Sequence, residues 1–479
     1  MKIPRCMSTQ HPDNASAPFF AANCVLAGED EIREAYYAFS HLGCDEQMWD
    51  VEGKEIDTYV VKKLLSYYPE YFRQNELGRD LRITLRVPNP TVEKAEAKIL
   101  LETLESIPRS YDAARLFYGH ELVPIFEVIL PMTTSARCID RIYRYYLNHI
   151  IGRQYSRFRE DDITIAQWIG DFLPSSIQVI PLFEDVPTML KVDQIMDEYL
   201  ADKEVEDQRV FLARSDTAMN YGLASAALAN KLALVKFEQV SRRTGVQLHP
   251  ILGMGSAPFR GGLHPHSVQR VGEEYPSVVT FTIQSAFKFD YPVSDVQDAC
   301  RFLKSRNIGP AAEVDEERAL DIIQRYSQAY RARITELAPQ ICRMSRYVPK
   351  RRARKLHVGQ FGYARAIGEV SLPRAISFTC SMYSLGLPPE LLAFESLDRK
   401  DLDFVLETYP SFRSKIEYAM AHTDFEGPFM TSSLQKALLD SGFDSQPDGE
   451  HLEVVRGLRQ AVDACDSVRA GDLMLRAAL

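Results

Sequence analysis

A glycine- and proline-rich stretch, LHPILGMGSAPFRGGLHPH at residues 248–266, carries residue types suited to binding an anion. Its first part, Leu248–Leu252, has the length and apolar character of a buried strand, and glycines follow. Arg260 stands directly before Gly261 and Gly262. Glycines let the backbone approach a ligand closely, and an arginine can bind a phosphate or a carboxylate through paired hydrogen bonds. An ordinary strand-to-helix loop can have the same composition, so this stretch alone does not decide between the two.

Two acidic residues follow other apolar runs, at positions where a divalent metal could bind. Glu184 comes directly after IQVIPLF, and Asp216 comes three positions after RVFLA. On adjacent parallel strands both carboxylates would face the same edge of the sheet. Carboxylate oxygens are suitable ligands for Mg²⁺ or Mn²⁺. Both acids also precede predicted helices, so capping the N-termini of those helices is the alternative role.

Other polar residues also stand at the ends of apolar runs. Arg86 ends LRITLR, and Gln284 and Lys288 follow VVTFTI. His11 lies in TQHPDN, where a neighbouring proline makes the turn rigid. A histidine can accept or donate a proton near neutral pH. A loop histidine more often caps a turn or lies in solvent, so the position of His11 does not by itself assign a role.

The densest basic cluster is PKRRARK at Pro349–Lys355, with Arg346 before it and Arg374 after it. One interpretation is a solvated surface or a patch that binds nucleic acid. The other is that arginines from distant segments converge on a phosphorylated, carboxylated substrate, because the planar guanidinium binds such groups through two hydrogen bonds. The net charge of −10 argues against nucleic acid as a partner.

Short apolar runs predict the strands that would position these side chains, and most are followed by a stretch with a helical pattern. Near-continuous apolar strands that alternate with helices indicate a parallel sheet covered on both faces. More than five such repeats, with polar residues after each strand, favour an α/β fold of the closed (β/α)₈ TIM-barrel type with extra helices. The predicted strands are Leu81–Val87, Pro124–Leu130, Ile177–Phe183, Arg209–Ala213, Leu248–Leu252 and Val278–Ile283, with Ser40–Asp50 and Phe378–Tyr383 as weaker candidates for the remaining two.

The 479 residues are expected to form a single catalytic domain. An embellished barrel would span about 40–385, after an N-terminal catalytic segment at 1–28 and before a largely helical C-terminal extension at 386–479. No apolar run approaches the length of a membrane span, and the N-terminus lacks the apolar core of a signal peptide. The eight cysteines are scattered without a CxxC pair, which is typical of reduced thiols in a cytoplasmic protein. Helices are predicted at Glu29–Leu42, Glu55–Phe72, Thr91–Ser106, Asn220–Thr244 and Ser294–Asn307.

Together these motifs resemble the phosphoenolpyruvate carboxylases of the short, archaeal type (type 2) along essentially the whole chain. The most specific stretches are IPRCMSTQHPDN, SHLGCDEQMWDVEGKE and LRVPNPTVEKAEAKILLETLESIPRSYD. Shorter pieces are similar to motifs of the larger bacterial and plant enzymes: TQHPDN to TAHPTE, VIPLFED to VVPLFET, ARSDTAMNYG to GYSDSxKDAG, and PFRGG to FHGRGG.

The resemblance implies a role for each matched residue. His11 and Arg260 take the places of catalytic residues, and Arg86 is a less specific match to a third. Glu184 and Asp216 are implied as ligands of Mg²⁺ or Mn²⁺. The residues implied in substrate binding are Gln284, Lys288, Arg346, Arg374, Gly261 and Gly262.

Two positions depart from the pattern of the larger enzymes. Met219 stands where SDSxKD has its lysine, and Pro258 stands where FHGRGG has its histidine. His264 or His266 could substitute for that histidine. The chain is also much shorter than the bacterial enzymes, and it has no readable counterpart of their allosteric C-terminal region.

The activity implied by the resemblance is carboxylation of phosphoenolpyruvate by bicarbonate to oxaloacetate and inorganic phosphate, through carboxyphosphate and a metal-stabilised enolate of pyruvate. The family expectation is a homotetramer that replenishes oxaloacetate, with neither nucleic acid nor a membrane as partner. One rival is another metal-dependent barrel acting on 2-oxo acids, of the aldolase or isocitrate lyase kind. A nucleic-acid-binding module and a structural scaffold are the others, and a scaffold leaves the acids and arginines after the strands unexplained.

Overall fold

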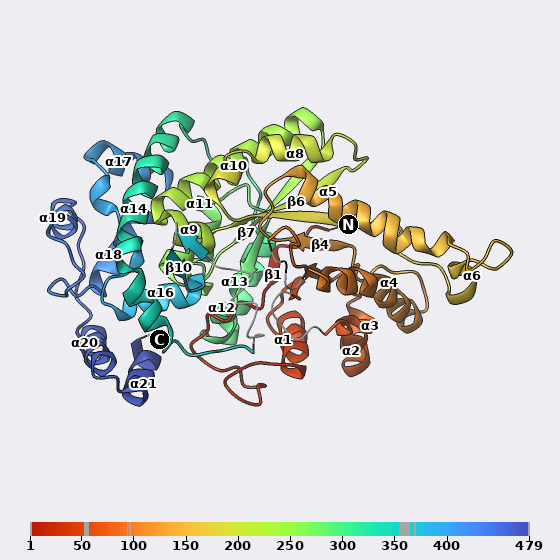
Figure 1. Ribbon diagram of the computed structural model, residues 1–479, viewed down its shortest axis with the longest axis horizontal. Helices are drawn as coiled ribbons and strands as arrows, with labels where there is room; N and C mark the ends of the chain where they lie inside the picture. Colours follow the sequence, from red (N-terminus) through yellow and green to blue (C-terminus); the bar gives the residue numbers. More distant parts are fainter. Residues whose placement is uncertain are drawn as a thin grey trace.

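The computed structural model contains a closed barrel of eight parallel strands surrounded by helices (Figure 1). Each strand pairs with its neighbours in chain order, and β8 pairs with β1 to close the barrel. The predicted α/β barrel is therefore confirmed, as are the six strands that were predicted from apolar runs. The structure describes residues 2–51, 57–92, 94, 97–353, 365–367 and 370–477. The strands are β1 (Cys6–Ser8), β2 (Glu46–Asp50), β3 (Arg82–Arg86), β4 (Glu127–Leu130), β5 (Gln178–Phe183), β6 (Asp207–Ala213), β7 (Gln247–Gly253) and β8 (Thr280–Ile283).

The structure corrects one of the two weaker strand candidates. β2 lies within Ser40–Asp50, but Phe378–Tyr383 belongs to helix α16 (Ala375–Ser384). Its large buried residues Phe378 and Met382 are four positions apart, which is the spacing of one helix face. The eighth strand is instead β1, which is only three residues long and lies in a proline-rich segment without strand periodicity.

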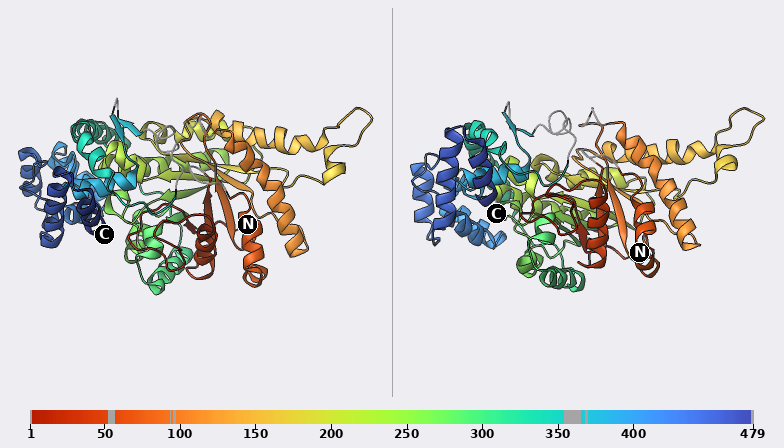
Figure 2. Two further views of the ribbon diagram at one scale, coloured as in Figure 1. Left: turned by 60° about the horizontal axis from the view of Figure 1, so that its bottom comes forward. Right: turned by 90° about the horizontal axis from the view of Figure 1, so that it is seen from below.

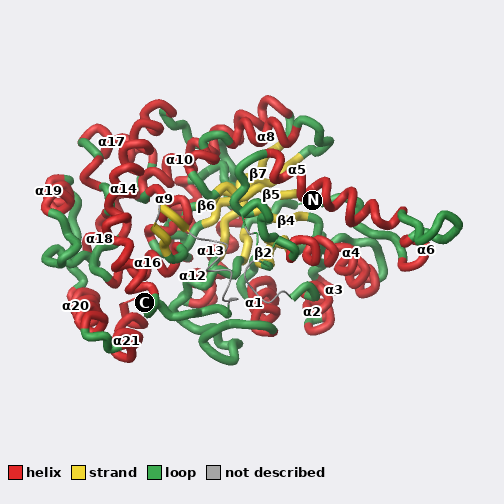
Figure 3. Tube along the Cα trace, viewed as in Figure 1, coloured by secondary structure: helices red, strands yellow, loops and turns green. Residues whose placement is uncertain are grey.

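The barrel interior and its outer surface form separate apolar clusters, because successive strand residues point to opposite faces. Met48 belongs to the interior cluster, whereas its neighbour Trp49 belongs to the large cluster between strands and helices. The helices thus cover the barrel from outside, as Figure 3 shows with yellow strands at the centre and red helices around them. The interior cluster comprises Met7, Met48, Ile129, Ile180, Leu182, Phe211, Ala213 and Ile251.

An ionic network fills the barrel interior near the N-terminal ends of the strands. Arg209 Nη2 donates to Glu46 Oε2 at 2.6 Å, and Arg209 Nη1 donates to Glu127 Oε2 at 3.1 Å. Arg82 Nη1 also donates to Glu127, at 2.8 Å. All four side chains are almost fully buried. A buried charge of this kind is tolerated only while its partners are present.

Replacing Arg209 with methionine is expected to lower the free energy of unfolding by about 3–5 kcal/mol, because Glu46 would remain buried without its cation. The measurement is urea unfolding at pH 7. Arg243→Met is the matched control, because Arg243 pairs with Asp197 on the surface, and an exposed pair contributes at most about 1 kcal/mol. If both variants lose the same small amount, the interior network does not stabilise the barrel.

The helices predicted in the N-terminal half of the chain are present, but they begin or end at residues other than those predicted. The helix predicted at Glu55–Phe72 is divided into α2 (Val60–Tyr67) and α3 (Pro69–Gln74), because the residue before a proline, here Pro69, disfavours helical conformation. Glu55 itself lies outside the described residues. The helix predicted at Thr91–Ser106 is α4, which begins at Ile99. The helices of this half and of the barrel are α1 (Glu29–Ser40), α2 (Val60–Tyr67), α3 (Pro69–Gln74), α4 (Ile99–Tyr118), α5 (Ala136–Tyr145), α6 (Ile165–Ile169), α7 (Val186–Met189), α8 (Val192–Leu200), α9 (Ser215–Tyr221), α10 (Leu223–Thr244), α11 (Val268–Glu274), α12 (Ser285–Phe289) and α13 (Val293–Ser305).

The chain beyond the barrel is mostly helical, as predicted. These helices gather at one end of the molecule, and the arm that carries α6 projects at the other end (Figure 2). Two short strands, β9 (Arg365–Ile367) and β10 (Val370–Leu372), form a separate antiparallel pair. Within the described part of the chain, no helix is both long and apolar enough to span a membrane. The helices are α14 (Glu316–Ser345), α16 (Ala375–Ser384), α17 (Arg399–Thr408), α18 (Phe412–Ala421), α19 (Ser432–Asp440), α20 (Gly449–Asp463) and α21 (Ser467–Ala477).

Candidate active site

Arg260 joins three segments that are far apart in the sequence. It ends a short 3₁₀ turn, η3 (Pro258–Arg260), in the loop after β7. Its Nη1 donates to Asp13 Oδ2 at 2.7 Å, and its Nη2 donates to Gln284 Oε1 at 2.6 Å. Asp13 comes from the segment after β1, and Gln284 directly follows β8. The guanidinium is 3% exposed, so its orientation is fixed by these two contacts.

The glycines around Arg260 leave room for charged side chains. A Cβ on Gly255 would lie 2.7 Å from the guanidinium carbon of Arg260. Gly262 has a φ of 70° and leaves space for the ammonium group of Lys415. Gly261, which stands between Arg260 and Gly262 in the sequence, has a φ of 120°. The loop therefore requires glycine at these positions because side chains of the protein itself, Arg260 and Lys415, occupy the neighbouring space.

His11 lies in the same N-terminal turn as Asp13. Its Nδ1 is 2.9 Å from Thr9 Oγ1, and its carbonyl accepts a hydrogen bond from Ser285 N at 3.2 Å. Asp13 Oδ1 accepts a further hydrogen bond from Ala286 N at 2.8 Å. The turn is thus fixed to the start of α12, beside Gln284. The structure brings His11, Arg260 and Gln284 to one corner of the barrel mouth.

Arg86 extends this group across the next two strands. It forms a two-pronged ion pair with Asp50, with both N–O distances at 3.0 Å. The backbone N–H of Asp50 donates to Gln10 Oε1, also at 3.0 Å. A continuous chain of contacts therefore runs from Arg86 on β3 to the turn that carries His11. The sequence motifs assign no role to Gln10, Asp13 or Asp50, although two of them lie in the TQHPDN motif.

Glu184 and Asp216 follow the consecutive strands β5 and β6, as expected. Glu184 Oε2 accepts a hydrogen bond from Met132 N at 2.7 Å, and its carbonyl accepts one from Thr217 Oγ1 at 2.9 Å. The capping alternative does not apply to Glu184, because Asp185 caps α7. Asp216 lies inside the first turn of α9, whose N-cap residue is Arg214.

The two carboxylates suit Mg²⁺ or Mn²⁺ by their chemistry. Mg²⁺ is commonly held by one or two carboxylates, with water and substrate oxygens as the other ligands. Within the described residues, no group of three His, Cys, Asp or Glu side chains is arranged to hold a metal ion. A metal at Glu184 and Asp216 would therefore complete its ligand shell with water and substrate.

The remaining predicted arginines are not joined to Arg260 by a hydrogen bond or an ion pair between described residues. Arg374 is the N-cap residue of α16, which packs against the loop through a contact between Phe378 and Phe259 with ring centroids 5.8 Å apart. Arg346 is exposed at the C-terminal end of α14. A substrate-binding role for either therefore stays a prediction.

Part of the basic cluster holds the N-terminal segment in place. Arg351 Nη2 donates to the carbonyl of Ala15 at 2.8 Å. Arg352 is fully buried and pairs with Glu31 and Glu34. Arg354 and Lys355 lie outside the described residues. The two described arginines of this cluster thus make contacts within the protein.

Lys288 has a different position from the one expected. Its Nζ donates to Ser8 Oγ at 3.0 Å, Thr9 O at 2.8 Å and Glu34 Oε1 at 2.8 Å, and the side chain is completely buried. An ammonium group has three donors, so all of them are committed to these partners. These contacts fix the strand that leads to His11, and a contact of Lys288 with substrate stays a prediction.

Glu34 is the shared partner of two buried cations, Lys288 and Arg352. Burial acts to raise the pKa of Glu34, but Arg352 and Lys288 outweigh it and hold the pKa at about 2. A lowered pKa in the folded state stabilises the fold above the unfolded value of about 4.5, and this stabilisation is lost as the pH falls toward 2.

Glu34→Gln is expected to lower the free energy of unfolding by at least about 3 kcal/mol at pH 7, because the buried Lys288 loses its carboxylate partner and Arg352 loses one of its two. The difference from wild type should shrink as the pH is lowered from 5 to 2. The measurement is urea unfolding at several pH values, with Glu453→Gln on the exposed side of α20 as control. A difference that does not depend on pH would contradict the ion-pair explanation.

Met219 differs from the motif of the larger enzymes, and His264 and His266 are the residues that could substitute for their missing histidine. Met219 is fully buried in the core. His264 stacks on Tyr291 with ring centroids 5.7 Å apart, and burial lowers its pKa to about 4. His266 is exposed and lies 3.6 Å from Asp295. Neither histidine contacts Arg260 within the described residues.

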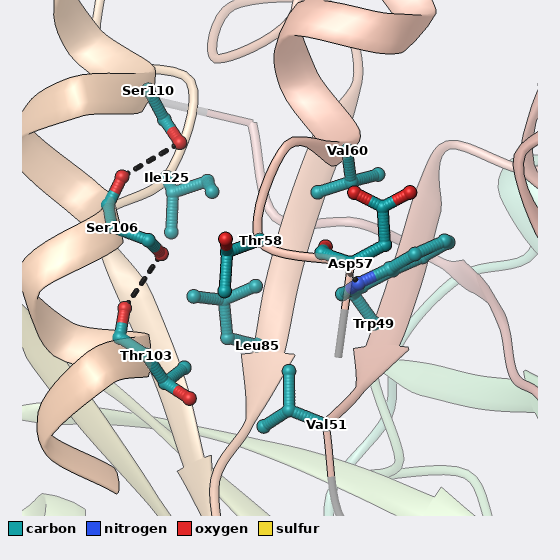
Figure 4. A pocket seen from close by; sticks show the side chains of 10 residues that line it. All are labelled: Trp49, Val51, Asp57, Thr58, Val60, Leu85, Thr103, Ser106, Ser110 and Ile125. Carbon is teal, nitrogen blue, oxygen red and sulfur yellow. Dashed lines mark hydrogen bonds between the residues drawn. The ribbon is translucent and has the colours of Figure 1, made fainter. Parts of the chain in front are cut away.

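A small pocket lies outside the barrel and does not belong to this group (Figure 4). Its walls are the outward-facing side chains of β2 and β3, such as Trp49 and Leu85, and one side of α4. Ser106 and Ser110 donate to carbonyls of their own helix. The pocket therefore contains none of the charged residues at the barrel mouth.

The sequence comparisons agree with each other over the whole chain. A family model described as "Phosphoenolpyruvate carboxylase" matches residues 3–478. A curated relative of that name from Methanothermobacter thermautotrophicus is 53% identical over 478 residues, covering 100% of this chain and 99% of the relative. Another from Methanospirillum hungatei is 53% identical over 477 residues, covering 100% and 98%. One from Halobacterium salinarum is 48% identical over 483 residues, covering 98% and 96%.

Proposed function

This chain belongs to the phosphoenolpyruvate carboxylase family, and we propose that the residues around Arg260 perform its reaction. The enzyme is a carbon–carbon lyase whose substrates in this family are phosphoenolpyruvate and bicarbonate. The observation that carries the assignment of the site is the convergence of Arg260, Asp13 and Gln284 beside the turn of His11.

Arg260 is proposed to bind the phosphoryl group as it moves from phosphoenolpyruvate to bicarbonate. Its guanidinium is oriented by Asp13 and Gln284 before substrate arrives, so little reorganisation is needed when charge shifts onto the phosphoryl oxygens. Arg374, Gly261, Gly262 and Arg346 are proposed to assist in binding phosphoenolpyruvate. Gln284 would contact substrate from the end of β8, beside Arg260.

Glu184 and Asp216 are proposed to hold Mg²⁺ or Mn²⁺. When bound, the metal would supply positive charge that stabilises the enolate oxygen. Glu184 is already oriented by the N–H of Met132, and Thr217, which follows Asp216, donates from its hydroxyl to the backbone carbonyl of Glu184. These contacts would hold the carboxylates in position and reduce the reorganisation that binding requires.

His11 is proposed to act as the acid–base group for the proton of carboxyphosphate as that intermediate releases carbon dioxide. Thr9 is within hydrogen-bond distance of Nδ1, which favours the use of Nε2 for the substrate. The enolate then forms a carbon–carbon bond with carbon dioxide to give oxaloacetate. Arg86, held by Asp50, would contribute positive charge from the end of β3.

The test is a coupled assay of oxaloacetate with phosphoenolpyruvate, run with and without bicarbonate and then with a chelator. Bicarbonate-dependent release of both oxaloacetate and phosphate, lost with the chelator and recovered with Mg²⁺ or Mn²⁺, is the expected result. Phosphate release that needs no bicarbonate would favour another enzyme of 2-oxo acids.

A cytoplasmic homotetramer is the assembly proposed from the family resemblance. Sedimentation equilibrium of the purified chain measures the assembly state directly. A monomer at micromolar concentration would contradict this part of the proposal without affecting the assignment of the active site.

A further inference from the structure

A lysine from the C-terminal helices reaches the backbone of the loop that carries Arg260. Lys415 on α18 donates from Nζ to the carbonyl of Gly261 at 2.9 Å, and the residue is 3% exposed. A Cβ on Gly262 would lie 2.6 Å from the same Nζ. The ammonium group therefore occupies the space left by the absence of a side chain at Gly262.

Lys415 is itself held in place by the N-terminal end of α18. Ser411, one helical turn before it, donates from its backbone N at 3.2 Å and from its Oγ at 2.9–3.0 Å to the carboxylate of Glu274. Glu274 ends α11, a helix of the barrel, and both side chains are buried. The lysine thus extends from a point that is fixed to the barrel, and it can hold the loop at a defined distance.

A second buried residue meets the other side of the same loop. Glu390, in the 3₁₀ turn η5 (Pro389–Leu391), accepts a hydrogen bond from Tyr383 OH at 2.9 Å. Burial raises the pKa of Glu390 to about 7, and the backbone N–H of Phe259 and the charge of Lys415 act to lower it. Buried side chains from beyond the barrel, Lys415 and Glu390, therefore lie against the loop that carries Arg260.

We propose that Lys415 is a positioning residue for Arg260, and that the helical C-terminal region is thereby part of the phosphoenolpyruvate site. The side chain of Arg260 is fixed by Asp13 and Gln284, and Lys415 fixes the backbone that follows it. Without Lys415, the carbonyl of Gly261 loses its buried donor and the loop can shift. This inference rests on the proposed role of Arg260 in binding the phosphoryl group.

Lys415→Met keeps most of the side-chain volume and removes the donor. We expect the KM for phosphoenolpyruvate to rise about tenfold and kcat/KM to fall about 10- to 100-fold, because small displacements of a substrate-binding group have effects of this size. The KM for bicarbonate should stay within about twofold of wild type. A purely structural role would instead lower the melting temperature and the active fraction, and would leave both KM values unchanged.

Gly262→Ala tests the same contact from the loop side, since the new Cβ would displace the ammonium group, and at a φ of 70° it also strains the loop backbone. It should also raise the KM for phosphoenolpyruvate selectively, and the double variant should be little worse than the worse single variant. Lys436→Met, on the exposed side of α19, is the matched control. A folded Lys415→Met enzyme with wild-type KM for phosphoenolpyruvate would overturn the proposal.

The wild-type assay separates this inference from the proposed function. If wild type shows no bicarbonate-dependent phosphate release, the function is wrong and the positioning role has no reaction to serve. If wild type is active and the variants match it, the function stands and the role of Lys415 is wrong.

Discussion

Asp216→Asn is expected to lower turnover at least about a thousandfold, the largest effect among the proposed site residues. The substitution keeps the shape of the side chain but removes one of the two negative charges that would hold the metal. Metal stabilisation of developing charge contributes several kcal/mol to such reactions, and each 1.4 kcal/mol is about tenfold in rate. Turnover and binding of Mn²⁺ to the free protein, followed by electron paramagnetic resonance, are the two measurements.

Binding of Mn²⁺ should weaken together with turnover, because both depend on the same carboxylate. Asp197→Asn, in an exposed ion pair on α8, is the matched control and should bind metal and turn over as wild type does. Undiminished affinity for Mn²⁺ in Asp216→Asn would remove Asp216 from the proposed ligands. The thermal midpoint of each variant shows whether a loss reflects unfolding.

His11→Asn is expected to separate the two halves of the reaction. Phosphoryl transfer would continue, because Arg260 and the proposed metal ligands are unchanged, but carboxyphosphate would lose the group that manages its proton. Acid–base groups of this kind contribute about 10²- to 10⁴-fold. Oxaloacetate formed per phosphate released should therefore fall at least about tenfold, with pyruvate as the other product.

The measurement is the ratio of oxaloacetate and pyruvate to phosphate in the same reaction. His41→Asn, an exposed residue at the end of α1, should keep the wild-type ratio. An unchanged ratio in His11→Asn, even at lower overall rate, would contradict the proton role of His11.

Strands that are covered on both faces could be predicted well from the sequence. A short, near-continuous apolar run such as Ile177–Phe183 is typical of a buried strand, and β5 is found there. β1 could not be found in this way, because three residues show no periodicity and their partners are β2 and β8. Phe378–Tyr383 was misassigned because six residues with mixed polarity fit either period, and the contact of Phe378 with Phe259 favours the helix.

The sequence predicts which polar residues belong to the site better than it predicts which residues they contact. Arg260 and Gln284 could be selected because they follow strands. The pairing of Arg260 with Asp13 spans 247 positions, and no local pattern reports a contact of that length. Lys288 shows the converse, since its place after β8 suggested a substrate contact and its three acceptors are all internal. Lys415 follows no strand and could be found only from the folded chain.

The pairing of β1 with β8 is also expected to delay the appearance of activity during folding. Thr280 Oγ1 donates to the carbonyl of Pro4, a contact between residues 276 positions apart. Such distant pairing is slow to form, and until it forms β1 and β8 each present an open edge to other chains. A refolding experiment should therefore regain most of its helical signal before any activity appears. Dilution or a chaperone in that interval should increase the final yield, because the open edges are then less exposed to one another.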